Sequence, residues 1–568
     1  MSTPPNTFAI ALAQLNPVVG DISGNLRRAR AARAKAAEQG ADLILFSELF
    51  IVGYTPEDLV LKPALQQAAM TAVTALAADT ADGGPAVLIG TPWAEDGALY
   101  NAVAYLDSGA VRGLTFKTDL PNYGVFDEKR VFRAGNPKGP FNIRGVRIGV
   151  PICEDIWTPD LVETLSETGA EILLSPNGSP FDALKREFRM NVVVARVVES
   201  GLPLVYLNQI GGQDELVFDG GSFVLNADRH LALQLPSWEE SIVVTRWTRT
   251  NGAWVSATGD LAPNEDMDAA LYAGMVLGLK DYVNKNRFKS VVLGLSGGID
   301  SALSAAVAVD ALGAARVRCV MMPSRFTSQD SLDDAAEVAT VLGTPYETIS
   351  IEAAFGTMTQ TLAPAFAGRA PDIAEENLQS RIRGMMLMAI SNKDGPMVLT
   401  TGNKSEMSVG YATLYGDMCG GYNVLKDLYK TQVFALSRWR NLHRPPGALG
   451  PPGHVIPERV ITKAPTAELR ANQTDQDSLP PYDILDGILE CLVEREMAIH
   501  DIVAKGYDLA TIRRVESLLY VAEYKRRQAP PGVKLSTRGF GRDRRYPITN
   551  RFRDTEWGAS LDRSSSTC

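Results

Sequence analysis

The sequence predicts an α/β protein with two domains, and three observations lead to this prediction. Apolar runs of strand length alternate with amphipathic segments of helical length through most of the chain, which is typical of layered α/β folds. At 568 residues the chain is too long for a single hydrophobic core. A polar stretch with glycine and proline, GDLAPNED at 259–266, reads as a linker. We therefore expect domains at 1–258 and 267–557, and a disordered tail at 558–568.

The overall composition excludes several classes of protein. Hydrophobic residues make up 45% of the chain and charged residues 21%, which are ordinary globular values. The net charge of −10 gives no reason to expect nucleic acid or an acidic membrane as a partner. The five cysteines are scattered and form no CxxC, which indicates reduced thiols and no zinc site. Since no signal peptide or membrane-spanning run is recognisable, we expect a cytoplasmic protein that acts on small molecules.

The first half places three reactive side chains just past the ends of predicted strands. We predict strands at 8–15, 43–46, 87–90, 101–105, 111–115, 147–152, 171–175 and 203–208, and helices at 25–39 and 185–199. Glu48, Lys117 and Cys153 follow the second, fifth and sixth of these strands. Active sites of α/β folds lie at such strand ends. Taken singly, however, each residue is more often a solvated charge or a small core thiol.

The sequence around these three residues favours a catalytic role for them over a solvated charge or a core thiol. FSELFIVGY around Glu48, FKTDLPNYGVFDEKRVF around Lys117 and PICEDIW around Cys153 resemble the nitrilase (carbon–nitrogen hydrolase) superfamily. The resemblance covers about residues 8–255 and implies a four-layer α-β-β-α sandwich with a Glu-Lys-Cys triad. Around Cys153 the match is especially close to the glutaminase domain of the glutamine-dependent NAD synthetases.

The residue types suit the hydrolysis of an amide. A thiolate is the nucleophile that a stable amide requires, and a neighbouring base must generate it. Glu48 would take the proton of Cys153 and pass it to the departing ammonia. Lys117, being charged, would stabilise the oxyanion together with a backbone N–H just after Cys153. The resemblance also implies that Glu128 helps to position the site.

The same resemblance implies where glutamine would bind. Tyr123 matches a tyrosine that contacts the substrate, and Ser179 and Lys185 match residues that hold its α-amino and α-carboxylate groups. For Lys185, the alternative of one more solvated lysine on a helix is almost equally good.

The second half is organised around VVLGLSGGIDSALSAAVAV at 291–309, an apolar strand, a glycine turn and a helix. This arrangement aims backbone N–H groups and a helix N-terminus at an anion. Gly297 and Gly298 allow a phosphate to come close to the backbone. Asp300 would repel a bare phosphate but suits one that arrives with a divalent cation. The motif is not a Walker loop, since no Gly-Lys-Ser/Thr follows.

SGGIDS resembles the pyrophosphate loop of the ATP pyrophosphatases, which release AMP and pyrophosphate. ENLQSRIRG, TTGNKSE and YGDMCGGYNVLKDLYKTQV follow it in the order and spacing of NAD synthetase domains. The resemblance covers about residues 267–555. Further strands are predicted at 317–322, 346–350 and 397–401, and helices at 267–286, 331–342 and 375–390. We therefore expect a Rossmann-like parallel sheet with ATP at its C-terminal edge.

The resemblance assigns ligands to single positions of the second domain. The positions implied to bind ATP are Gly294, Leu295, Ser296, Gly297, Gly298, Ile299, Asp300, Ser301 and Thr401. The positions implied to bind deamido-NAD are Asn377, Glu406, Lys430 and Lys525. Asp300 and Glu406 would hold Mg²⁺, with ATP as cosubstrate, although a strand-end acid such as Glu406 can also be merely solvated.

The implied reaction joins the two domains. The nicotinate carboxylate of deamido-NAD would attack ATP and expel pyrophosphate, and ammonia from glutamine would then displace AMP to form NAD. Because free ammonia is mostly protonated near neutral pH, a sheltered path between the sites is expected. The resemblance further implies a homo-oligomer, at least a dimer through the synthetase domain.

The C-terminal part holds two segments of unusual composition. Residues 440–481 are rich in proline and glycine and are expected to form a mobile lid or to be disordered. Helices are predicted at 484–503 and 509–522. Residues 525–553 hold ten Lys or Arg against one Asp, which indicates either a polyanion site or a solvated basic tail.

Three rival functions remain to be weighed. Asparagine and GMP synthetases carry the pyrophosphate loop, but their glutaminases are not of the nitrilase type. A tRNA thiolation enzyme would explain the basic segment. Such enzymes, however, generally use extra cysteines in or near the loop domain, and the cysteines of this chain show no paired spacing. A binding protein with inactive sites is disfavoured by the complete triad and the complete loop.

Overall fold

The computed structural model describes residues 5–554, which divide into two compact units with bounds Met1–Glu265 and Asp266–Cys568. The expected disordered tail at 558–568 lies outside the described residues. Within the described part of the chain, no helix is both long enough and apolar enough to cross a bilayer.

The first unit is built from two mixed sheets. One has seven strands in the order β15-β14-β1-β2-β3-β4-β5, and the other has six in the order β13-β12-β9-β8-β7-β6. The strands are β1 Thr7–Gln14, β2 Leu43–Phe46, β3 Ala86–Glu95, β4 Ala98–Asp107, β5 Ala110–Phe116, β6 Phe141–Ile143, β7 Val146–Gly149, β8 Ile172–Asn177, β9 Leu204–Asn208, β12 Phe223–Leu225, β13 Leu231–Gln234, β14 Ser241–Thr250 and β15 Ala253–Ser256. A small hairpin, β10 Ile210–Gln213 with β11 Leu216–Asp219, is separate from both sheets.

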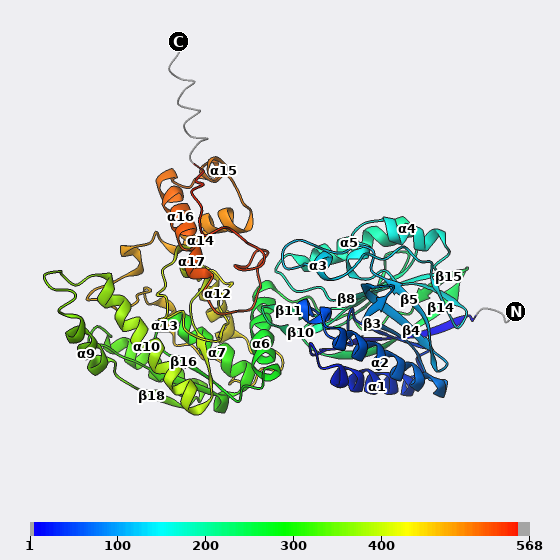
Figure 1. Cartoon of the computed structure of the whole chain (residues 1–568), viewed down its shortest axis with the longest axis horizontal. Helices are drawn as coiled ribbons and strands as arrows, with labels where there is room; N and C mark the ends of the chain where they lie inside the picture. Colours follow the sequence, from blue (N-terminus) through cyan, green and yellow to red (C-terminus); the bar gives the residue numbers. More distant parts are fainter. Residues whose placement is uncertain (1–4, 555–568) are drawn as a thin grey trace, which may run out of the picture. The chain divides into compact units, whose positions relative to one another are not determined.

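Helices cover the outer face of each sheet (Figure 1). They are α1 Ile22–Glu38, α2 Pro63–Asp79, α3 Glu128–Val131, α4 Asp160–Glu167 and α5 Lys185–Ser200. The central core joins the two sheets through side chains such as Leu45, Ile148 and Val205, which are fully buried. One outer core lies under α1 and α2, and another under α4 and α5. The predicted four-layer α-β-β-α sandwich is therefore confirmed.

Parallel pairing sets the position of the first site. β1, β2 and β3 are parallel neighbours in one sheet, and β7, β8 and β9 are parallel neighbours in the other. Glu48 follows β2 and Cys153 follows β7, so the two residues emerge from C-terminal strand ends on facing sheets. The sequence analysis missed the strands after residue 208. In β14, for example, Trp247 points into the core while its arginine and threonine neighbours do not, and such alternation is a weaker signal than a continuous apolar run.

The second unit carries a five-stranded, wholly parallel sheet in the order β18-β17-β16-β19-β20. Its strands are β16 Val291–Gly294, β17 Val317–Met321, β18 Tyr346–Thr348, β19 Met397–Thr400 and β20 Tyr422–Asn423. Its helices are α6 Met267–Lys285, α7 Ile299–Leu312, α8 Gln329–Leu342, α9 Glu352–Leu362, α10 Ile373–Asp394, α11 Lys404–Val409, α12 Lys430–Leu442, α13 Glu458–Thr462, α14 Tyr482–Leu489, α15 Ile499–Ala504, α16 Leu509–Val521 and α17 Glu523–Arg526. The strand order reverses between β16 and β19, and such a switch point opens a crevice at the C-terminal strand ends. The prediction of a Rossmann-like parallel sheet is confirmed.

Two expectations about the C-terminal part differ from the structure. The single helix predicted at 484–503 is wrong, because α14 runs into a short π-helical turn and α15 begins only after residues 495–498, where Glu496 has a φ of +47°. Residues 440–481, expected to be a mobile lid or disordered, are ordered and contain α13 and a 3₁₀ turn at Asp475–Asp477, so only the expectation of disorder is wrong and the lid stays a prediction. Asn441 is central to this segment, since its side chain donates to the carbonyl of Ile456 and accepts from the backbone of the same residue.

A buried ion pair joins three helices of the second unit. Arg440 of α12 donates to Asp310 of α7 at 2.6 and 3.0 Å, and Tyr272 of α6 donates to the same carboxylate at 2.7 Å. The side chains of the ion pair are fully buried. Removing one member leaves an uncompensated charge inside the protein, which costs more than removing both.

We predict that Asp310→Ala lowers the free energy of unfolding of this unit by about 3–5 kcal/mol, because Arg440 and Tyr272 lose their partner. The double variant Asp310→Ala/Arg440→Met should be less destabilised than the single one. Urea denaturation followed by circular dichroism measures both, with the exposed Arg438→Ala of α12 as the control. Equal losses in the single and double variants would contradict the prediction.

Candidate active sites

The first site is a buried lysine shared by two carboxylates. Lys117, just after β5, donates to Glu48 at 2.7 Å and to Glu128 at 2.9 Å. Lys117 and Glu48 are fully buried, and Glu128 is 5% exposed. Asn101 of β4 donates to Glu48 at 2.7 Å, and Tyr54 donates to Glu128 at 2.8 Å. The structure thus brings together residues from four separate segments, of which the sequence analysis named Glu48, Lys117 and Glu128.

The protonation of this cluster follows from its burial. Burial alone would lower the pKa of Lys117, but Glu128 and Glu48 outweigh it and raise that pKa well above its usual value. Burial raises the pKa of Glu128 to about 7, against the opposing effect of Lys117. The buried ammonium therefore faces two carboxyl groups, and the one on Glu128 takes up a proton more readily than an exposed glutamate does.

Cys153 begins a short 3₁₀ turn, Cys153–Ile156, directly after β7. Its φ of +49° lies in the left-handed region that a non-glycine residue adopts only when the surrounding structure holds it there. The thiol is 4% exposed, and burial and the charge of Glu48 raise its pKa well above the usual value, with Lys117 opposing them. The resting group is therefore a neutral thiol that needs a base.

The residues expected to bind glutamine come from three places in the first unit, since Tyr123 lies before α3, Ser179 follows β8 and Lys185 begins α5. Tyr123 is half exposed and donates to Glu154 at 2.8 Å. The backbone of Ser179 donates to Asn208 at 2.9 Å, and its hydroxyl accepts from Arg189. The sequence analysis missed Glu154, whose pKa is raised by burial. Its place directly after the nucleophile, inside PICEDIW, was the signal that could have identified it.

Lys185 opens α5, and its ammonium lies 5.1 Å from the ring centre of Phe126 and 6.0 Å from that of Trp157. An ammonium held over aromatic faces is an anchored charge and not a freely solvated one.

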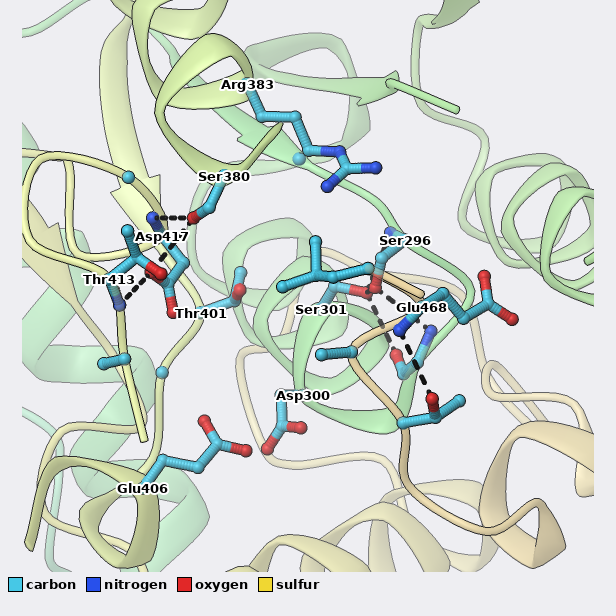
Figure 2. A pocket seen from close by; sticks show the side chains of 18 of the residues that line it. Ser296, Asp300, Ser301, Ser380, Arg383, Thr401, Glu406, Thr413, Asp417 and Glu468 are labelled. Carbon is cyan, nitrogen blue, oxygen red and sulfur yellow. Dashed lines mark hydrogen bonds between the residues drawn. The ribbon is translucent and has the colours of Figure 1, made fainter. Parts of the chain in front are cut away.

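The second site is a cavity of about 400 Å³ at the C-terminal edge of the parallel sheet. All the positions predicted to bind ATP or deamido-NAD line it, from Gly294 through Ser301 together with Asn377, Thr401, Glu406, Lys430 and Lys525. Figure 2 shows Ser296, Asp300 and Ser301 on the loop and helix start that follow β16. Gly297 has a φ of +79°, and a Cβ there would lie 2.3 Å from the carbonyl oxygen of Ser331. Only glycine fits this close approach of two backbones.

Asp300 and Glu406 face each other across the cavity (Figure 2), and Lys430 contacts both carboxylates. Asn403 donates to Asp300 at 2.9 Å and accepts from the backbone of Glu406, so one side chain positions both acids. Burial, and after it the charge of Asp300, raise the pKa of Glu406 to about 8, against the effect of Lys430. This corner carries more acidic groups than its one lysine balances, which favours an added cation.

Other side chains shape the opposite wall of the cavity. Asn377 accepts from Thr413 at 2.8 Å, and Lys525 donates to the carbonyls of Gly410 and Ala412. Arg383 of α10, which the sequence analysis did not single out, points into the cavity in Figure 2 and donates to the carbonyl of Met322.

The basic segment 525–553 is largely committed to contacts within its own unit. Arg526 donates to the carbonyls of Met407, Ser408 and Leu519 and pairs with Glu523. Arg544 pairs with Glu523 as well. These arginines hold the C-terminal segment in place, which weakens the argument for a polyanion surface along it.

Comparisons with known proteins match both units. The carbon-nitrogen hydrolase family matches residues 9–251, and the NAD synthase family matches residues 271–529. A glutamine-dependent NAD(+) synthetase from Rhodobacter capsulatus is 53% identical over 96% of this chain and 99% of that protein. The chain belongs to the glutamine-dependent NAD(+) synthetase family. The resemblance drawn from the sequence is confirmed.

Further relatives agree with this assignment. A glutamine-dependent NAD(+) synthetase from Xanthomonas campestris is 47% identical over 96% of this chain and 98% of that protein. A solved glutamine-dependent NAD+ synthetase from Acinetobacter baumannii, in complex with adenosine diphosphate, is 43% identical with a TM-score of 0.77 and covers 96% of this chain and 99% of its own.

The raised pKa of the Cys153 thiol yields a test by alkylation. We predict that carbamidomethylation of Cys153 by iodoacetamide is slow at pH 7 and still rises at pH 9, because burial and Glu48 keep the thiol protonated. Mass spectrometry of the labelled peptide at a series of pH values measures this rate. A rate that levels off below pH 8 would show a thiolate at rest and contradict the prediction.

Proposed function

We propose that this chain amidates deamido-NAD to NAD in an ATP-dependent reaction with ammonia released from glutamine. The observation that supports this most directly is the presence of two complete sites in one chain of this family. A buried thiol beside a lysine and two carboxylates lies in one unit, and a cavity lined by a pyrophosphate loop lies in the other. We assign the glutaminase to residues 1–258 and the synthetase to residues 267–557.

In the first half-reaction Glu48 takes the proton of Cys153 as the sulfur attacks the glutamine amide. Lys117 and a backbone N–H after Cys153 stabilise the tetrahedral oxyanion. Glu48 returns the proton to the leaving nitrogen, so that ammonia departs and a glutamyl thioester remains. Water, deprotonated by Glu48, then releases glutamate.

The charges around the thiol suit the zwitterionic end of glutamine. Lys185, held over two aromatic rings, would pair with the α-carboxylate. Glu154 and Ser179 would receive the α-ammonium, with Tyr123 orienting Glu154 through its hydroxyl. These opposite charges select a free amino acid over a neutral amide.

In the second half-reaction the pyrophosphate loop and the N-terminus of α7 bind the phosphates of ATP, and Thr401 contacts the nucleotide. Asn377, Glu406 and Lys525 hold deamido-NAD so that its nicotinate carboxylate faces the α-phosphate. Lys430 stabilises the charge that builds up as pyrophosphate leaves. Ammonia then displaces AMP from the adenylate and forms the amide.

The residues present fit a magnesium ion. No group of three or more His, Cys, Asp or Glu side chains suited to a metal occurs among residues 5–554. Mg²⁺, however, is commonly held by one or two carboxylates and by substrate phosphates. Asp300 and Glu406 would supply the carboxylates, and a bound cation would favour the ionised form of Glu406, whose pKa is raised by burial and by the charge of Asp300. The ion would neutralise phosphate charge during the transfer.

Two further expectations belong to this proposal. The protein acts in the cytoplasm, since its substrates are intracellular nucleotides and the four cysteines among residues 5–554 are unpaired. It assembles at least into a dimer through the synthetase domain, an expectation that rests on the family resemblance.

We predict that Cys153→Ala forms no NAD with glutamine but keeps the wild-type rate with ammonium chloride, because only the first half-reaction needs the thiol. NAD formation from deamido-NAD, ATP and Mg²⁺ is measured with each nitrogen donor. Cys491→Ala, which removes a buried thiol from the second unit, is the control. Glutamine-dependent activity in Cys153→Ala would rule out the proposed nucleophile, and no NAD from wild type with either donor would rule out the function.

We predict that Gly297→Ala reduces NAD formation at least about 100-fold with both donors. The new Cβ would meet the backbone of Ser331, and a φ of +79° is strained for alanine, so the phosphate-binding loop must move. Gly356→Ala in α9, where a Cβ meets nothing within 4 Å, is the matched control. Near wild-type activity of Gly297→Ala would contradict the role of this loop.

A further inference from the structure

Asp155 is a buried carboxylate that the proposed mechanism does not use. It lies two residues after Cys153, its exposure is 0%, and it has no ion-pair partner among the described residues. It accepts four hydrogen bonds. The donors are Ile152 N–H at 2.9 Å, Thr118 N–H at 2.9 Å, Thr118 Oγ1–H at 2.7 Å and Asp119 N–H at 2.8 Å.

These four bonds connect the backbones next to two catalytic side chains. On one side, Asp155 closes the turn around Cys153, since its carboxylate accepts from Ile152 and its own N–H donates to the carbonyl of Ile152 at 3.0 Å. This turn holds Cys153 at its positive φ. On the other side, Asp155 binds the two residues that directly follow Lys117.

We propose that Asp155 is a positioning residue that fixes the distance between the Cys153 thiol and the Lys117 ammonium during amide hydrolysis. The inference rests on the proposed glutaminase function. Lys117 and Cys153 come from different sheets, and Asp155 ties the segments that carry them together at full burial. Three of its four bonds run to backbone N–H groups, so they constrain the backbone positions from which the side chains of Cys153 and Lys117 extend.

The chemistry of the donors requires a carboxylate and not an amide. All four partners donate, and an ionised carboxylate is a pure acceptor. Burial raises the pKa of Asp155 to about 6, while the bonds from Asp119, Ile152 and Thr118 lower it, so the group is mostly ionised at neutral pH. In Asp155→Asn, the amide nitrogen must face the N–H of Ile152 or the donors of Thr118 and Asp119. The variant side chain then loses its hydrogen bonds either to the turn around Cys153 or to the residues that follow Lys117, although it keeps the size and shape of aspartate.

The test compares Asp155→Asn with wild type in glutamine-dependent and ammonia-dependent NAD formation. We expect kcat with glutamine to fall about 100-fold, because catalysis is sensitive to misplacements of about 1 Å. The KM for glutamine should change less than about threefold, and the rate with ammonia should stay at the wild-type level, which also shows that the chain is folded. Asp160→Asn, an exposed acid at the start of α4, is the control.

Other outcomes overturn the inference. A glutamine kcat within threefold of wild type, a change confined to KM, or a parallel loss with both donors would each reject a positioning role. If Asp155→Asn does not fold, Thr118→Val removes one of the four donors and keeps the side-chain shape. A several-fold fall in its glutamine kcat at constant KM supports the inference, and an unchanged kcat rejects it. Glutamine-dependent activity in Cys153→Ala would instead reject the glutaminase function itself.

Discussion

Both sites depend on one constraint, a buried lysine that two carboxylates share. Lys117 lies between Glu48 and Glu128, and Lys430 lies between Asp300 and Glu406. Each arrangement places two carboxyl groups around one ammonium inside the protein, where an unbalanced charge is costly. In each case burial, and after it the neighbouring acid, raises the pKa of one carboxyl group, to about 7 for Glu128 and about 8 for Glu406. In each site, therefore, a bound cation or a proton can balance the negative charge of the two carboxyl groups.

The positive charge that balances the carboxyl groups differs between the two sites, being a proton in the first and a bound cation in the second. In the proposed reaction of the first site, a proton passes from the thiol to a carboxylate and on to the leaving nitrogen, and the buried carboxyl groups beside Lys117 can hold such a proton. The second opens into a cavity that admits phosphates, and there a cation bound to the triphosphate can balance the acids. One arrangement of side chains thus serves proton transfer in one unit and phosphate chemistry in the other.

The sequence could predict those parts of the sites that local patterns determine. The pyrophosphate loop was recognisable because strand, glycine turn and helix are adjacent in the chain, and because only glycine fits the position of Gly297. Tyr54 and Asn101 were not found, because only the pairing of β2, β3 and β4 brings them to Glu48 and Glu128. The helix predicted at 484–503 failed because its apolar pattern continues past a left-handed residue, Glu496, that no periodicity reveals.

The charge balance of the first site bears on the form in which nitrogen leaves it. Ammonia is useful to the second half-reaction only as the neutral base. An ionised Glu128 adds a negative charge beside Lys117 and favours ammonium, whereas a protonated Glu128 removes that charge and makes the buried site less favourable for a second cation. Burial raises the pKa of Glu128 to about 7, so this carboxyl group can hold a proton near neutral pH, and we propose that this proton favours departure of the product as ammonia. On this argument Glu128 does more than position Lys117, since its own protonation sets the charge of what leaves.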